Sequence, residues 1–137
     1  MLQHTMPHVI WVWTHDLLSG NYEQGYSTLQ DENNYCCLGV ACISLQKRKL
    51  ISKNSVIFYP LNGKLKGDDL GEQEAVFKKL NLQKYSGTNK NRSGNSLTSL
   101  NDSWGWSFKK IAIYLREHWK NYVTQKSLDE WYLNGGS

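Results

Sequence analysis

Apolar residues recur at helical spacing in several stretches of the chain and predict most of its elements. In the first half, a helix is expected over residues 7–19, because Pro7 suits a first helical turn and Gly20 a helix end. A second helix is expected to end near the basic run 47–49, whose charge complements the helix dipole. Its apolar stripe consists of Leu38, Ala41, Cys42 and Leu45.

The second half of the chain carries four further helical signals. A capping-box pattern at 69–72 precedes an apolar face over 76–80, and a short helix is expected over 96–101. Ser107 is the expected N-cap of a longer helix, and Ser127 of a short last one. The stripe of the longer helix consists of Phe108, Ile111, Ala112, Leu115 and Trp119.

Between the helices, strand signals are short. A strand over 26–30, a turn over 31–34 and a return over 35–37 suggest one hairpin, and Asn62-Gly63 suggests a second within 56–65. Residues 84–96 show no periodicity and predict a long polar loop that is disordered or contacts a ligand. The pattern therefore predicts a single compact α+β domain over 1–134, mainly helical with one or two short β-hairpins, and a flexible tail over 135–137.

Composition places the chain among ordinary globular domains. It has 137 residues, of which 39% are hydrophobic and 20% charged, with six Trp and eight Tyr. It lacks the run of roughly 20 apolar residues that a membrane span requires, and its first residues lack the basic region of a secretory signal. Three cysteines make a poor disulfide framework. We therefore expect a cytoplasmic protein without membrane contact.

The net charge of +4 is unevenly distributed along the chain. Residues 1–46 contain four Asp or Glu and no Lys or Arg, whereas residues 47–92 contain eleven Lys or Arg against four Asp or Glu. Such a basic middle segment favours an anionic partner such as a nucleotide, a nucleic acid or an acidic protein face. A solvated surface without a partner explains the same charges.

All three cysteines lie between positions 36 and 42, which allows two interpretations. Cys36 and Cys37 precede a predicted helix, whose dipole lowers a thiol pKa, so either is a candidate nucleophile. None of the four histidines lies in a recognisable base motif, however, and small buried residues around Gly39 equally suit close helix packing. The spacing does not match a zinc site, so we expect no metal. Common cofactor motifs are missing, and we expect no cofactor.

The turn between the helices predicted over 96–101 and after Ser107 is the main candidate binding site. Indole rings can stack on a base, and a helix N-terminus offers N–H groups to a phosphate. An Asx-capped turn whose tryptophans pack between helices is the structural alternative. The candidate ligand-binding residues, which include two cations of the 84–96 loop, are Asn101, Asp102, Trp104, Trp106, Ser107, Lys90 and Arg92.

Three sequence blocks resemble a recurrent family of small uncharacterised proteins of tailed phages and prophages. The family pattern is W-x₃-L-x-S-G-x-Y-x-Q, then [YF]-C-C-L-G-V-x-C, then L-x-x-L-N-D with S-F-x-x-I-A. The first block is represented here by Leu17 or Leu18, Ser19, Gly20, Tyr22 and Gln24, the second by residues 35–42, and the third by 97–102 and 107–112. The match spans most of residues 11–117. The resemblance implies a phage origin and a host-cytoplasm setting, and carries no catalytic residues over.

These observations lead us to expect a non-enzymatic phage protein that counters host defence. It would sequester an anionic nucleotide signal or block a host defence protein. One alternative is a cysteine-dependent hydrolase or transferase that acts on a nucleotide or peptide through Cys36 or Cys37. Another is a DNA-associated accessory factor, since residues 96–119 look like a helix-turn-helix with basic side chains on its second helix.

Overall fold

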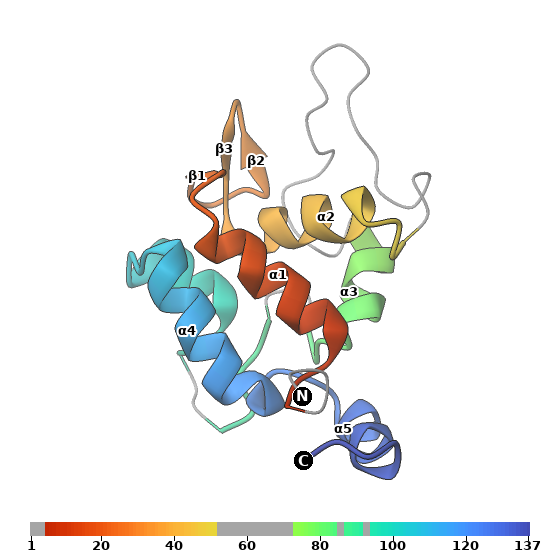
Figure 1. Ribbon diagram of the computed structural model, residues 1–137. Helices are drawn as coiled ribbons and strands as arrows, with labels where there is room; N and C mark the ends of the chain where they lie inside the picture. Colours follow the sequence, from red (N-terminus) through yellow and green to blue (C-terminus); the bar gives the residue numbers. More distant parts are fainter. Residues whose placement is uncertain (1–4, 52–72, 85–86, 92–93) are drawn as a thin grey trace.

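Two helices that are far apart in the sequence pack side by side at the centre of the molecule. In the computed structural model, which describes residues 5–51, 73–84, 87–91 and 94–137, these are α1 (His8–Leu18) and α4 (Phe108–His118). Helix α2 (Cys37–Lys47) lies beside α1, and α3 (Glu74–Leu80) contacts both helices (Figure 1). Helix α5 (Gln125–Leu133) lies at the opposite end of the molecule from the sheet (Figure 1).

A small sheet covers the junction between α1 and α2. Its strands are β1 (Glu23–Gln24), β2 (Gln30–Asp31) and β3 (Asn34–Tyr35), in the order β1-β3-β2. Strands β2 and β3 pair antiparallel, whereas β1 pairs parallel with β3. A hairpin is therefore present, but it is shorter than predicted and shifted along the chain: β2 shares only Gln30 with the predicted strand 26–30, and Cys37 of the predicted return 35–37 belongs to α2. The parallel strand was not predicted. The α+β class is confirmed.

Two short irregular helices flank α4 and complete the fold. A π-helical turn, η4 (Ser99–Ser103), precedes α4, and a 3₁₀ turn, η5 (Trp119–Asn121), follows it. The predicted cap of α4 is confirmed, because Ser107 Oγ accepts a hydrogen bond from Lys110 N at 3.2 Å. The cap expected at Ser127 is wrong: the N-cap of α5 is Thr124, three residues earlier, whose Oγ1 accepts from Ser127 N at 3.3 Å.

The cysteine segment forms the start of α2 and the middle of the core. Gly39 is required there because a β-carbon at this position would lie 1.9 Å from the carbonyl oxygen of Leu29. Trp13 of α1 is fully buried, and its Nε1 donates to Cys37 O at 2.8 Å. Helix α2 therefore packs at backbone distance against Leu29, the residue before β2, as its small residues predict.

A buried carboxylate fastens α1 to α2. Asp16 is only 3% exposed and accepts hydrogen bonds from Arg48 at 2.6 and 2.9 Å and a short one from Ser44 Oγ. Lys47 Nζ lies 3.3 Å from the same carboxylate. Burial alone would raise the pKa of Asp16, but hydrogen bonds from Arg48, Ser44 and Lys47 outweigh it and lower the pKa to about 2. Asp16 is therefore ionised whenever the protein is folded near neutral pH.

The described parts of the 84–96 loop are packed against the end of α4. Asn89 is 4% exposed, and its Nδ2 donates to the hydroxyls of Tyr114 and Tyr122 at 3.4 and 3.2 Å. Tyr122 in turn donates to Asn95 O at 2.7 Å. A buried polar side chain, Asn89, thus attaches this loop to the helical core, a contact that the hydrophobic pattern of the sequence does not predict. The second hairpin predicted over 56–65 and the capping box at 69–72 lie outside the described residues.

The last residues of the chain fold back on α5. Gly136 N donates to Trp131 O at 2.9 Å, and Lys120 Nζ donates to Ser137 O at 3.1 Å. The expected mobility of residues 135–137 stays a prediction. Within the described ranges, none of the helices has the length and apolar character that crossing a bilayer requires.

Candidate functional site

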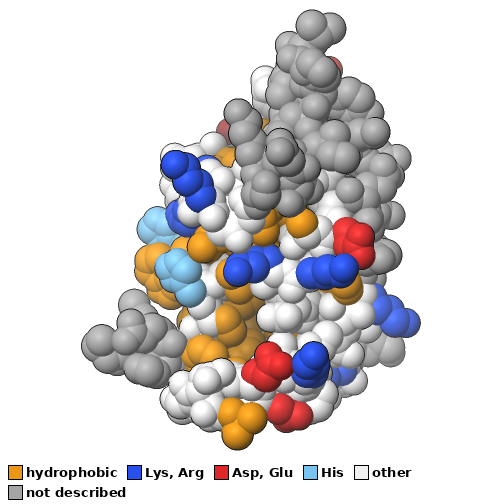
Figure 2. Space-filling model, turned by 90° about the vertical axis from the view of Figure 1, so that its right-hand side faces the viewer, with side chains coloured by type: hydrophobic (Ala, Val, Ile, Leu, Met, Phe, Trp, Pro, Cys, Tyr) orange, Lys and Arg blue, Asp and Glu red, His pale blue; other side chains and the backbone are white. Residues whose placement is uncertain are grey.

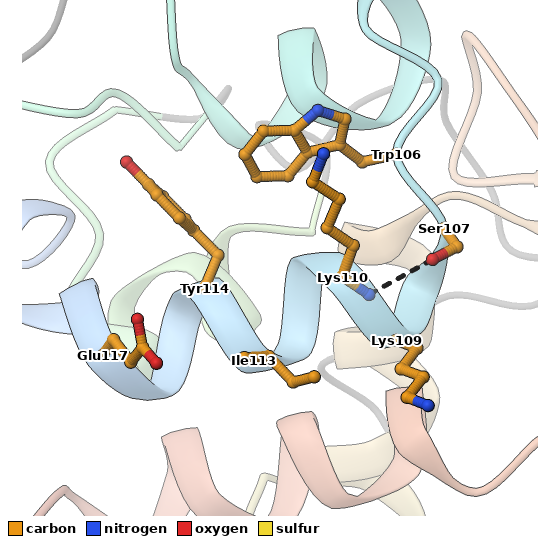
Figure 3. Close-up of a pocket in the computed structure, with 7 residues that line it drawn as sticks. All are labelled: Trp106, Ser107, Lys109, Lys110, Ile113, Tyr114 and Glu117. Atoms are coloured by element: carbon orange, nitrogen blue, oxygen red, sulfur yellow. Dashed lines mark hydrogen bonds between the residues drawn. The ribbon is translucent and has the colours of Figure 1, made fainter.

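A pocket of about 370 Å³ opens along one side of α4. Ligand pockets in proteins commonly measure about 300–1,000 Å³, so this one has room for a small molecule. Figure 3 shows two aromatic side chains on one side of the helix, lysines at its N-terminal end and a carboxylate toward its C-terminal end. The lining residues are Trp106, Ser107, Lys109, Lys110, Ile113, Tyr114 and Glu117.

Aromatic rings form the wall of the pocket. Trp106 and Tyr114 meet edge to face, with ring centres 5.3 Å apart and planes at 79°. Tyr114 also packs on His118, at 4.4 Å between ring centres, and its hydroxyl accepts the bond from Asn89. The wall is thus held from two sides, and a ligand meets a preformed surface.

Trp106 is positioned by a residue 82 positions away in the sequence. Gln24 of β1 donates from Nε2 to Trp106 O at 2.7 Å and to Asn101 Oδ1 at 2.9 Å. The first sequence block is thereby connected to the third at the point where the chain enters α4. This connection holds the backbone of Trp106 where the chain approaches α4.

Positive charge lies at the N-terminal end of the pocket. Lys109 and Lys110 are exposed, and Lys110 Nζ lies 4.2 Å from the centre of the Trp106 ring, a cation–π contact. The side chain of Ser107 caps the helix, whose first N–H groups add partial positive charge. Glu117, at the other end, is the one acidic residue among those that line the pocket. The pocket therefore has a cationic and an anionic end.

Two of the predicted ligand residues hold the fold together instead. Asn101 is fully buried, and its side chain accepts from Cys37 N and Gln24 and donates to Gly25 O and Asp102 at 2.8–3.2 Å. Both ends of the amide are occupied by protein groups, so it lies out of reach of a ligand. Asp102 Oδ1 likewise accepts from Ser27 N at 2.9 Å.

The other predicted residues divide between the pocket and the rest of the surface. Trp106 and Ser107 line the pocket. Trp104 is 62% exposed, donates from Nε1 to Gly94 O at 3.1 Å and does not line it. Lys90 is exposed but also absent from the lining, and Arg92 lies outside the described residues.

The prediction missed the pocket-facing side of α4. Lys110, Ile113, Tyr114 and Glu117 follow one another at spacings of three, one and three residues, which places them on one face of a helix. That spacing follows directly from the Ser107 cap, so the signal was available in the sequence. The spacing alone does not identify a pocket, because these residues lie opposite the apolar stripe and have the composition of an ordinary solvated helix face.

The thiols lack the features of a nucleophile. Cys36 is 7% exposed, and Cys37 and Cys42 are fully buried. Burial raises the pKa of Cys36 to about 11 and holds the pKa of Cys37 and Cys42 well above the ordinary value. Cys36 Sγ instead caps α2 by accepting from Gly39 N at 3.4 Å. Their role in this structure is packing.

The rest of the described surface offers less for a ligand. A second hollow of about 160 Å³ lies between α5 and the ends of α1 and α3, which is small for a nucleotide. Figure 2 shows hydrophobic side chains in a furrow above α5, with Lys and Arg scattered rather than gathered on that face. Among the residues the structure describes, no cluster of three His, Cys, Asp or Glu could hold a metal.

Fold and pocket together define a small, mainly helical α+β domain with an aromatic and lysine-lined pocket along one helix. The chain belongs to the family described as a domain of unknown function, DUF8296, whose model matches residues 6–119. The match includes α1, α2 and α4 with the whole pocket, and ends before α5. Comparison with curated proteins and with solved structures finds no match.

Proposed function

We propose that this protein is a non-enzymatic binding protein that holds an anionic nucleotide in the pocket along α4. The observation that carries the proposal is the contact of Trp106 with Lys110, beside Lys109 and the capped start of α4. A base stacks on an indole, and a phosphate is met by ammonium groups and helix N–H groups. The pocket offers both within one helical turn.

Exposure of the lysines supports this proposal over a structural role for them. Lys110 rests on the Trp106 ring with its ammonium group in solvent, and no ion pair to either lysine occurs among the described residues. A flexible lysine can leave the ring for a phosphate while a base takes its place. The site is thus charged and partly apolar, and the Lys110 side chain that lies on the indole can be displaced by a ligand.

Titration of nucleoside monophosphates and of the unphosphorylated nucleosides, followed by calorimetry, tests the proposal. We expect nucleotides to bind more tightly than nucleosides, and Trp106→Ala to weaken nucleotide binding about tenfold, the order of one lost stacking contact. Trp104→Ala is the matched control, because this neighbouring indole lies outside the pocket, and should leave affinity unchanged.

A second pair of variants separates charge from stacking. Lys109→Ala combined with Lys110→Ala should remove the preference for nucleotides over nucleosides. Lys79→Ala, which changes an exposed lysine on α3, should not. Absence of heat and of any tryptophan fluorescence change with all nucleotides would refute nucleotide binding.

For the biological setting, we propose that a phage protein uses this pocket in the host cytoplasm to sequester a nucleotide signal of host defence. The support is the resemblance of residues 11–117 to phage proteins, together with a site suited to holding a ligand. Expression in a bacterium with a nucleotide-signalled defence system should restore phage plating. The Trp106→Ala variant should fail to do so at equal protein level, and equal rescue by both would contradict this setting.

A further inference from the structure

A second aromatic and cationic unit lies on the other side of α4. Trp11 of α1 stacks on His15, with ring centres 5.1 Å apart and planes 10° apart. The guanidinium of Arg116 lies 5.7 Å from the centre of the Trp11 ring, and its Nε donates to Thr14 Oγ1 at 2.8 Å. Because His15 is exposed, the stack ends in a flat ring at the surface.

The surface between the two units is positive and partly apolar. It is formed by α4 itself, where Lys109 is exposed and Ile113 is 46% exposed. Helices α1 and α4 contain two carboxylates, of which Asp16 is buried and paired and Glu117 lies at the far end. The cations Lys109, Lys110 and Arg116 therefore outnumber the one exposed carboxylate of these two helices, Glu117, which directly follows Arg116.

We propose that the ligand is a single-stranded oligonucleotide that crosses α4; this inference rests on the proposed nucleotide site. One base would stack on Trp106 and a later one on the His15–Trp11 stack, with the intervening phosphates at Lys109, Lys110 and Arg116. A helix with its side chains is about 10–12 Å wide. Because each nucleotide extends a strand by at least about 3.4 Å, its rise when stacked, at most three to four nucleotides span this width.

Single strands fit this surface better than duplexes do. Aromatic rings take up bases only where the bases are unpaired and unstacked from their own neighbours. Readout of a duplex instead needs side chains suited to base edges on a helix that enters a groove. Here the exposed side of α4 offers Lys109, Lys110 and Ile113, with rings flanking the helix on both sides.

A length series tests this inference on the full chain. Thymidine monophosphate and oligothymidylates of two, four and eight nucleotides are titrated at constant salt, with tryptophan quenching as the readout. We expect affinity to rise about tenfold or more from one to four nucleotides, the order of one further stacked base, and little beyond four. His15→Ala should lower the affinity for the four-nucleotide strand about five- to tenfold and leave the monophosphate unaffected.

His8→Ala serves as the matched control, since His8 is an exposed histidine at the start of the same helix. It should leave both affinities unchanged. If the monophosphate binds and length adds nothing, the crossing strand is wrong while the proposed pocket function stands. If neither binds, both proposals fail. Equal competition by a duplex or by a polyglutamate peptide would also overturn the inference, because a general anionic surface would then explain the binding.

Discussion

Asn101 shows how one residue can connect segments that are far apart in the sequence. Its amide links β1, the first turn of α2 and η4 through Gln24, Gly25 and Cys37, which lie 64 to 77 positions away. We expect Asn101→Asp to lower the free energy of unfolding by about 2–4 kcal/mol, since the variant buries a charge and loses two donated hydrogen bonds. Urea denaturation measures this.

Asn33→Asp is the control for that substitution, because Asn33 is exposed in the turn between β2 and β3. A change within about 0.5 kcal/mol is expected there. If Asn101→Asp were equally mild and instead abolished ligand binding, the buried amide would have a direct part in recognition.

The thiols of the chain should be inert while the protein is folded. Burial raises the pKa of Cys36 to about 11 and holds that of the two other thiols well above the ordinary value, so at about pH 8 almost no thiolate forms. Iodoacetamide should add nothing to the native protein and three groups to the protein in concentrated urea, as counted by mass spectrometry. Rapid modification of one native thiol would revive a cysteine-dependent activity.

At the scale of elements, the junction of α1 and α2 should depend on pH through Asp16. Its folded pKa of about 2 lies below the ordinary value, so its charge stabilises the fold fully above about pH 4. That contribution is lost as the pH falls through 2. Asp16→Asn should therefore be about 2 kcal/mol less stable near neutral pH and approach the wild type below pH 2.

Thermal unfolding of both proteins between pH 7 and pH 2 measures that difference. Glu23→Gln, at an exposed carboxylate of β1, should differ little from the wild type at any pH. A gap between wild type and Asp16→Asn that stayed constant down to pH 2 would mean that packing, rather than the ion pair with Arg48, accounts for the loss.

The helices could be predicted from the sequence more closely than the strands. Helices α1, α2 and α4 each follow an apolar stripe of several turns, and their observed bounds lie within one or two residues of the prediction. Each strand has two residues, too few for an alternating pattern. In the sheet, β1 pairs directly with β3, although β2 lies between them in the sequence. That pairing depends on Gly25, where a β-carbon would lie 2.9 Å from Asn34 Cβ.

The candidate site was only half predictable for a related reason. Trp106 and Ser107 belong to a recognisable turn, but the pocket needs Gln24 to place Trp106, and no local pattern links positions 24 and 106. Asn101 was predicted to bind a ligand because it is a polar residue in that turn. Its amide forms hydrogen bonds with residues 64 or more positions away, and no local sequence pattern predicts such contacts.

At the scale of the whole molecule, charge along the chain and charge on the surface differ. The segment 47–92 is the most basic in sequence, yet Arg48 is paired with Asp16 and Lys78 with Glu74. The cations of the two aromatic units, Lys110 and Arg116, instead come from α4, which carries three Lys or Arg and one Glu. Ligand binding should therefore depend on salt through α4 rather than through the basic segment.

That dependence can be stated as a slope. Each phosphate of a single strand that a cation neutralises contributes about −0.7 to the slope of log affinity against log salt, so three contacts give about −2. Removing Lys109 and Lys110 together should reduce the slope to about −0.7, with Arg116 as the remaining contact. Titrations of a four-nucleotide strand at several salt concentrations measure both values, and Lys79→Ala should keep the full slope. A slope that stayed near −2 without the two lysines would place the phosphates elsewhere on the protein.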